Sequence, residues 1–595
     1  MLRLAQICDA IGATTKKLEK TALVAAYLRS LPVDEAALAA IFLSGRPFPA
    51  YEEATLQVGG ALLWREIAEL SGKSEQELTA IYRKYGDAGC VAAEALPERG
   101  ESGVSLAALQ RTFSEIATAR GPAAKAALLK QLLERVTPLE AKYIVKIISG
   151  DLRIGLKESL VEEGIARAFE APLDRVKRAN MLLGDLGETL RFASEGKLAD
   201  AHLRLFHPID FMLASPVESS AEALSHFQNA SVEDKYDGIR AQAHVGRGEV
   251  RIFSRTRDEI TESFPELPVA LAGLPKDAIL DGEIVAWTLT STSGAGGVPA
   301  RASPFSVLQQ RLGRKKVSAK LMRDVPVAYL VFDVLYADGE LMLDHPLRER
   351  AKVLDELMGC LETSGLSTVR VGTAAPSASS GQALGRPAER SSATFARPSQ
   401  NLFAFAAPEL PSATVLRAPV APAHSEQGLE TLFTAARNRG NEGLMIKDLD
   451  SFYTPGRRGK SWLKMKRELA TLDVVVTAVE YGHGKRIGVL SDYTFAVWEG
   501  ERLVNIGKAY SGLTVAEIAE MTQWFLAHKI SEQGLRLEVE PKIVLEVAFN
   551  NIMRSTRHES GYALRFPRIV RLRPDKRAED ADMIETVKEI YGRQR

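Results

Sequence analysis

The sequence predicts a multidomain α+β protein with an all-helical front part, an α/β middle part and a small C-terminal β-barrel. Three observations support this prediction. The chain has 595 residues, enough for about three or four domains. The spacing of its apolar residues changes from helical to strand-like near residue 206. After residue 469, apolar runs separated by glycine turns follow one another.

Residues 1–205 are predicted to form helices. The stretches "GALLWREIAELSG" and "AKAALLKQLLERV" place apolar residues three and four positions apart, the spacing of one buried helix face. Gly, Pro or Ser separates such stretches, as expected where helices end. The first twenty residues alternate apolar and polar types and lack a small-residue cleavage site, so they do not have the pattern of a signal peptide.

Residues 206–468 are predicted to form the α/β part, because short β-rich runs such as "VAYLVFDVLYA" alternate there with turns and helical stretches. Within this part, residues 372–424 consist largely of Ala, Ser and Pro with few large apolar residues. We expect them to form a low-complexity surface insertion, because such a composition cannot build a core. The insertion is either a neutral loop or a segment that docks a partner.

Residues 469–595 contain several strand-like runs and one helical run, "VAEIAEMTQWFLAHK". Roughly five strands and a helix in about 125 residues fit a barrel of the oligonucleotide-binding (OB) kind. Other small barrels have a similar pattern, so the OB-fold is one of several solutions at this point.

Composition narrows the function classes. Lys and Arg together number 76, and so do Asp and Glu, so a nucleic-acid partner would have to bind local basic patches rather than a basic chain. No apolar run approaches the 18 or so residues that a membrane span needs. Cys8, Cys90 and Cys360 lie too far apart for a disulfide framework or a four-cysteine zinc site. We expect a cytoplasmic protein without a membrane partner.

The candidate nucleophile is Lys235 in "EDKYDGIR", residues 233–240. The pattern Lys-x-Asp-Gly is weak alone, since ordinary residue frequencies give on the order of 0.1 chance matches in a chain of this length. A charged strand end that runs into a turn has the same letters. Residues elsewhere in the chain must therefore decide between these two interpretations.

Further charged or aromatic residues lie at the edges of apolar strands downstream. Each has an ordinary structural explanation, such as a solvated strand face, a core aromatic ring or a turn residue. Taken in chain order they are Arg240, Arg255, Glu283, Phe332, Glu442, Lys447, Arg458, Lys464 and Lys466.

In order and approximate spacing, these motifs resemble the motif series of the covalent nucleotidyltransferases, which comprise DNA ligases, RNA ligases and mRNA capping enzymes. "IISGDLRIGLKESLV" at 147–161 and "GYALRFPRIVRLRPDK" near the C-terminus resemble ATP-dependent DNA ligases of the archaeal and eukaryotic replicative type. NAD-dependent ligases carry a four-cysteine zinc site, which three scattered cysteines exclude. Capping enzymes and most RNA ligases lack a helical front domain. The resemblance spans nearly the whole chain apart from residues 372–424.

The resemblance implies a helical DNA-binding domain at 1–205, an adenylation domain at 206–468 and an OB-fold domain at 469–595. It implies ATP and Mg²⁺ as cofactors and nicked double-stranded DNA as the substrate. Lys235 would attack the α-phosphorus of ATP, the AMP would pass to the 5′-phosphate of the nick, and the 3′-hydroxyl would then displace AMP. Such an enzyme serves DNA replication, repair, recombination and cell division. By analogy it is a monomer, and a sliding clamp is a possible partner.

The resemblance also assigns roles to the motif residues. Lys464 and Lys466 would face the α-phosphate, where phosphoryl transfer needs cations. Neighbouring cations are expected to favour the neutral, nucleophilic form of the Lys235 amine. The candidates are Arg240, Lys447, Lys464 and Lys466. Further contacts to the nucleotide or the nick are expected from Arg240, Arg255 and Arg458.

Two carboxylates are expected to bind metal, because Mg²⁺ prefers oxygen ligands. Glu442 matches the family's metal ligand, and Glu283 matches a residue that contacts the ribose and helps to bind metal. Phe332 would stack on the adenine. Glu233 would accept a hydrogen bond from the adenine amino group and so favour ATP over GTP.

Basic residues outside this set are candidates for DNA contacts. Arg153 and Lys157 could reach the DNA backbone, although an exposed helix end would look the same. The stretch "RFPRIVRLRPDK" could close over ATP as a lid, or it could be a basic strand that binds phosphates non-specifically. Its basic residues are Arg565, Arg568, Arg571, Arg573 and Lys576.

Two alternatives stay open. An RNA ligase or a GTP-using capping enzyme shares the same core, and labelled ATP against GTP would separate them. A non-catalytic nick-binding protein would keep the fold but lose the nucleophile or the metal carboxylates, and Lys235, Glu283 and Glu442 are all present.

Overall fold

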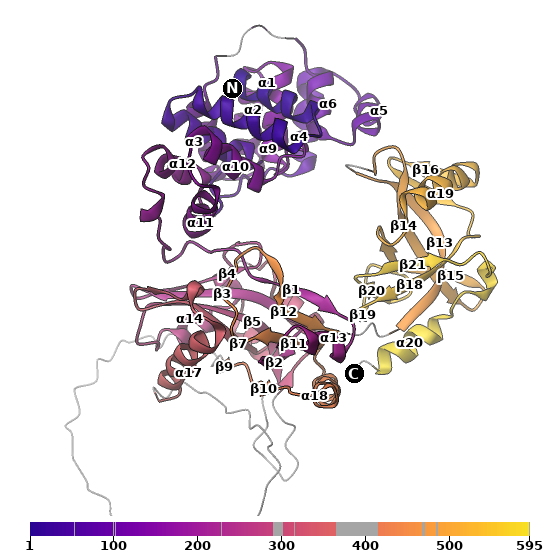
Figure 1. Ribbon diagram of the computed structural model, residues 1–595. Coiled ribbons are helices and arrows are strands. Elements are labelled where there is room, and N and C mark those ends of the chain that lie inside the picture. Colours follow the sequence, from indigo (N-terminus) through magenta and orange to yellow (C-terminus); the bar gives the residue numbers. More distant parts are fainter. Residues whose placement is uncertain are drawn as a thin grey trace, which may run out of the picture. The chain divides into compact units, whose positions relative to one another are not determined.

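The computed structural model (Figure 1) describes residues 1–593 except 53, 99, 101–102, 228, 289–300, 315, 364–413, 467–469 and 484–485. It divides into two compact units, one made of Met1–Phe211 and Lys466–Arg595 and the other of Met212–Met465. The first unit contains two separate apolar cores, one among residues 4–198 and one among residues 472–587. Among the described residues, no helix is long and apolar enough to cross a bilayer.

The N-terminal part is helical, as the sequence predicts. Sequence-encoded caps start several helices: Ser74 with Glu77 and Thr137 with Glu140 form capping boxes at α5 and α9. The helices are α1 (Leu2–Ala13), α2 (Lys17–Arg29), α3 (Val33–Leu43), α4 (Gly60–Ser71), α5 (Glu75–Tyr85), α6 (Ala88–Ala95), α7 (Leu106–Thr118), α8 (Pro122–Leu133), α9 (Pro138–Ile148), α10 (Glu158–Ala168), α11 (Leu173–Leu183) and α12 (Leu186–Ser194).

The central unit contains two sheets with helices beside them (Figure 1). The five-stranded sheet has the order β1 (Leu213–Val217), β12 (Arg458–Met465), β11 (Gly443–Asp448), β2 (Ala230–Lys235) and β10 (Val420–Pro422). The seven-stranded sheet has the order β4 (Glu249–Ser254), β3 (Ile239–Gly246), β5 (Ala278–Thr288), β7 (Val327–Ala337) and β8 (Glu340–Leu341), with β6 (Arg301–Ala302) on β5 and β9 (Thr414–Arg417) on β7. The helices are α13 (Ser220–Ser225), α14 (Glu266–Leu271), α15 (Phe305–Leu308), α16 (Ala319–Asp324), α17 (Leu347–Thr363) and α18 (Glu426–Asn438).

Strand alternation gives the five-stranded sheet one apolar and one polar face. Val232, Leu444 and Leu463 belong to a core that also contains Leu429 and Phe433 of α18. Because successive side chains of a strand point to opposite faces, the residues between them face away from α18. The strand that ends at Lys235 therefore buries one face and presents the other to the site.

The prediction of one surface insertion over residues 372–424 is wrong at its C-terminal end. Residues 372–413 lie outside the described part of the chain. Residues 414–417 form β9, which pairs in parallel with β7, and residues 420–422 form β10, which pairs antiparallel with β2. Val415 and Leu416 are buried. Such short strands need only a few apolar residues, so the surrounding Ala and Pro obscured them.

The C-terminal part is β-rich, as expected, and its long strand β13 (Ala470–Tyr481) pairs with three others. One sheet contains β13 with β14 (Leu490–Glu499), β15 (Arg502–Ala509), β16 (Lys529–Gln533), β17 (Arg536–Val539), β18 (Val544–Phe549) and β21 (Arg568–Leu572). The strands β19 (Asn551–Arg554) and β20 (Tyr562–Arg565) pair with each other. The helices of this part are α19 (Val515–Ala527) and α20 (Ile584–Arg593).

Candidate functional site

Sheet register brings Lys235 and Glu442 together although 207 residues separate them. Lys235 ends β2, and Glu442 immediately precedes β11, which pairs with β2 so that Lys235 lies opposite Gly443. The Lys235 Nζ contacts Glu442 Oε2, and the Glu442 backbone N–H donates to the Lys235 carbonyl at 2.8 Å. Both side chains are about one-fifth exposed, at 22% and 20%. Reagents can therefore reach an amine that the sheet holds in place.

A buried ion pair lies on the same face of the sheet. The Lys447 Nζ donates to Glu233 Oε2 at 2.6 Å, and the two side chains are 1% and 5% exposed. Burial lowers the pKa of Lys447, against the opposing effect of Glu233. The ammonium also lies 4.3 Å from the ring centre of Phe332 and 4.4 Å from that of Trp462. Since Phe332 belongs to β7, these contacts join the two sheets.

Arg240 is held by a second buried carboxylate. Its guanidinium makes two hydrogen bonds to Asp281, at 3.1 and 2.7 Å, and Asp281 also accepts from the Tyr453 hydroxyl at 2.7 Å. Another guanidinium N–H donates to the Met212 carbonyl at 2.6 Å. Arg240 thus ties β3 to the start of the central unit.

These pairings correct one expectation from the sequence. Arg240 and Lys447 were expected to act as cations on Lys235, yet each is paired with its own carboxylate, and the group in contact with Lys235 is the anion Glu442. The physical reason is burial, because a charge taken out of water needs a counter-charge. Their charges are thus largely neutralised locally.

Glu283 lies opposite Arg240 in the pairing of β3 with β5 and accepts from the Gly238 N–H at 3.2 Å. Desolvation raises the pKa of Glu283 to about 7, although Lys235 and Arg240 oppose this shift. The described residues contain no group of three or more His, Cys, Asp or Glu side chains that could cage a metal. One or two carboxylates fit Mg²⁺, which binds few protein ligands and completes its shell with phosphate oxygens and water.

The remaining predicted nucleotide contacts are spread along the strands. Lys464 lies opposite Met445, which lies opposite Glu233, so all three share one face of the sheet. Lys466 follows β12, and its Nζ donates to Asn550 Oδ1 at 3.5 Å. Arg458 is exposed at the start of β12, and Arg255 is exposed in the turn after β4.

Two site residues escaped the sequence analysis. Trp462 is 1% exposed, and its Nε1 has no hydrogen-bond partner among the described residues. Asp281, fully buried, neutralises Arg240. Each lies two positions before a predicted residue on the same strand, Lys464 and Glu283 respectively, and a search at that spacing would have found both.

The predicted DNA contacts of the helical part lie on the loop between α9 and α10. Arg153 and Lys157 are exposed, and Arg153 has a left-handed backbone with φ of 52°. Two buried lysines brace this loop from inside: Lys20 donates to the Ile154 carbonyl, and Lys146 donates to the Leu152 carbonyl at 3.0 Å. The loop is thus fixed. Lys157 is exposed on it, whereas the partly exposed Arg153 side chain donates to the Gly86 carbonyl and lies 3.9 Å from the Asp87 carboxylate.

Several basic residues of the C-terminal motif form ion pairs within their own domain. Arg573 and Lys576 both bind Asp473 on β13, with Nη1 2.9 Å and Nζ 2.7 Å from its carboxylate oxygens. Arg571 donates to Glu546 at 2.6 Å. Arg565 and Arg568 flank Phe566 in the turn between β20 and β21, and Phe566 is 66% exposed.

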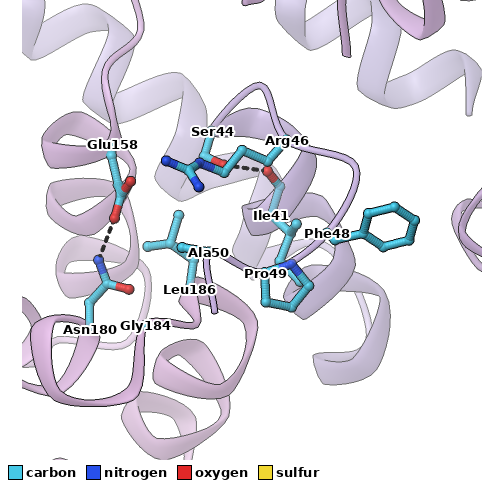
Figure 2. A pocket seen from close by; sticks show the side chains of 10 residues that line it. All are labelled: Ile41, Ser44, Arg46, Phe48, Pro49, Ala50, Glu158, Asn180, Gly184 and Leu186. Carbon is cyan, nitrogen blue, oxygen red and sulfur yellow. Dashed lines mark hydrogen bonds between the residues drawn. The ribbon is translucent and has the colours of Figure 1, made fainter. Parts of the chain in front are cut away.

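A small pocket in the helical part is separate from these residues. Figure 2 shows its lining, in which Asn180 of α11 donates to Glu158 of α10 at 2.9 Å beside Arg46 and Gly184. None of the predicted nucleotide or metal residues lines it.

Comparison with known proteins assigns all three parts. Residues 1–166 match the family described as DNA ligase N terminus, and residues 211–374 and 414–466 match the ATP dependent DNA ligase domain. Residues 486–576 match the ATP dependent DNA ligase C terminal region. The gap in the central match, residues 375–413, falls inside the predicted insertion.

Relatives match over the full length. A probable DNA ligase of Koribacter versatilis is 55% identical, over 100% of this chain and 97% of that protein. A DNA ligase of Archaeoglobus fulgidus is 33% identical, over 99% of this chain and 97% of that protein. The solved structure named Pmar-Lig_Pre shares the fold, with a TM-score of 0.58 and 15% identity over 96% of this chain and 99% of that one. The chain belongs to the family of ATP-dependent DNA ligases.

Proposed function

We propose that this chain seals nicks in duplex DNA by way of an AMP group carried on Lys235. The observation that carries the proposal is the contact of Lys235 with Glu442 on the sheet face that also holds the Glu233–Lys447 pair. The Lys235 nitrogen would form a bond to the α-phosphorus of ATP while the bond to pyrophosphate breaks. Covalent capture divides one difficult displacement into easier ones.

The surrounding residues would bind and orient the nucleotide. Phe332 would stack on the adenine, and Glu233 would accept from its amino group while Lys447 holds the carboxylate in place. Lys464, on the same sheet face, would bind an α-phosphate oxygen. Arg240 would act mainly by holding β3 in place against Met212, to whose carbonyl it donates a hydrogen bond.

Glu283 and Glu442 are the residues that would hold Mg²⁺, which when bound would neutralise charge on the phosphate oxygens. Two observations support this assignment: Glu442 contacts Lys235, which immediately precedes the turn between β2 and β3, and Glu283 accepts from the Gly238 N–H within that turn. Because Glu442 also contacts the Lys235 amine, the same carboxylate would orient the nucleophile and help to hold the metal.

The DNA would be held by the other parts of the chain. The exposed basic loop at Arg153 and Lys157 and the turn at Arg565 and Arg568 are the proposed backbone contacts, because cations at phosphates dominate DNA affinity. By analogy with the family, we also propose action as a cytoplasmic monomer in replication and repair, with a sliding clamp as a partner.

The test is to mix the full chain with α-phosphate-labelled ATP and Mg²⁺, and then to add nicked duplex DNA without ATP. Label should attach to wild type and leave as the nick is sealed, and Lys235→Ala should take no label. Label retained by Lys235→Ala would refute the nucleophile assignment. If RNA ends release the label from the protein and nicked DNA does not, the RNA ligase alternative is favoured.

A further inference from the structure

The turn between α18 and β11 is fastened to the two residues at the end of β2. It runs from Arg439, the C-cap of α18, to Glu442, and Gly440 within it has a left-handed φ of 85°. The Arg439 guanidinium makes two hydrogen bonds to Asp234, at 2.8 and 2.7 Å. Asn441 donates to the same carboxylate at 2.6 Å. These bonds lie on Asp234, one position before Lys235.

Asp234 points to the opposite face of β2 from Lys235, because adjacent strand residues alternate. Its side chain is 14% exposed, and Asn441 is 4% exposed. Asp234 therefore cannot touch a nucleotide bound on the Lys235 face. It can act only through the turn, whose last residue, Glu442, contacts the Lys235 amine and carbonyl.

We propose that Asp234, Arg439 and Asn441 form a clamp that sets the position of Glu442 relative to Lys235. The clamp residues are positioning residues and not catalytic ones. Without the clamp, the turn is still attached by the Glu442 N–H bond to Lys235, but its side chains lose the anchor on the far face of the strand. The inference rests on the proposed function, because it assigns the clamp to the residues that transfer AMP.

The clamp makes a kinetic prediction. A displacement of about 1 Å in a group that orients reactants costs on the order of 100-fold in rate. Arg439→Ala should therefore slow single-turnover attachment of labelled AMP by about 10- to 100-fold, with KM for ATP changed by less than about threefold. Arg439 is half exposed, at 51%, so this variant should fold, and its unfolding midpoint should stay within about 4 °C of wild type.

The matched control is Lys276→Ala, which removes a cation of similar exposure (53% against 51% for Arg439) from an ion pair in the same unit, 3.2 Å from the more exposed Asp338. It should attach AMP at the wild-type rate. The exchanged pair Asp234→Arg with Arg439→Asp should recover part of the rate lost in Arg439→Ala, since it restores a charge pair across the same gap.

The outcomes are distinct. A slower rate with unchanged KM in Arg439→Ala, normal behaviour of Lys276→Ala and partial recovery in the exchanged pair would support the clamp. An unchanged rate in Arg439→Ala would overturn the proposal. A lower rate together with a changed KM for ATP and a lower unfolding midpoint would also overturn it, because that pattern indicates a general structural role. If wild type itself takes no label, the proposed function fails instead.

Discussion

Replacing Lys447 by methionine should destabilise the central unit strongly. The substitution keeps a similar shape between Phe332 and Trp462 but leaves Glu233 buried without its partner. Removing one member of a buried ion pair costs about 3–5 kcal/mol. The lost attraction between the ammonium and the aromatic rings adds up to about 2 kcal/mol, which contacts to the methionine sulfur partly replace.

The double variant Glu233→Gln with Lys447→Met separates the effect of charge from the effect of packing. It removes both charges, so most of the loss should return, and the coupling between the sites should exceed about 2 kcal/mol. Calorimetry of the full chain should show the transition of the central unit falling by about 6–20 °C in Lys447→Met, at roughly 2–4 °C per kcal/mol for a loss of about 3–5 kcal/mol. A transition in Lys447→Met within about 2 °C of wild type would refute the reasoning, because it would show that Glu233 is not desolvated in solution.

Three further predictions follow from the same geometry. The pKa of Glu283 is raised from 4.5 to about 7 in the folded chain, so its ionisation disfavours the folded state at pH values above 4.5. Without nucleotide or metal, Glu283→Gln should therefore stabilise the chain by up to about 3 kcal/mol at pH 8 and leave it unchanged at pH 4. Equal shifts of the melting temperature at both pH values would contradict this. A Cβ at Gly238 would lie 2.2 Å from the Ile284 carbonyl oxygen, so Gly238→Ala should displace the turn after Lys235 and lower AMP attachment about 100-fold; attachment at the wild-type rate would show that the turn can shift without cost. A chain that lacks residues 1–205 should still attach labelled AMP but seal nicks poorly, and sealing equal to the full chain would remove the helical part from DNA binding.

Local sequence signals predicted much of the architecture correctly. The helices of the N-terminal part appear where apolar spacing indicates them, and capping boxes at Ser74 and Thr137 start two of them. The β-rich C-terminal part was likewise recognisable from its glycine-separated strands. These features depend on residues within one or two turns of each other, so their signals are contained in short windows. The order of the short motifs around Lys235 likewise indicated the family.

The strands within residues 414–422 were not predictable from local sequence signals. Their composition resembles that of the neighbouring residues, and only pairing with β7 and β2 makes them strands. Strand pairing depends on residues far away in the chain, and the composition of a short segment contains no information about them. The prediction of an insertion failed there for that reason.

By itself the sequence indicated most of the chemical groups of the candidate site: a lysine, three carboxylates, an aromatic ring and several cations. Only the tertiary structure decided which of these groups meet. The register of β2 with β11 puts Glu442 rather than a cation on Lys235, and burial pairs Arg240 with Asp281 and Lys447 with Glu233. The reason is that the attraction between charges in a low-dielectric interior depends on their distance in space. The residues of the Lys235–Glu442 and Lys447–Glu233 pairs are more than 200 positions apart in the chain, and they come close to each other only when the sheets form.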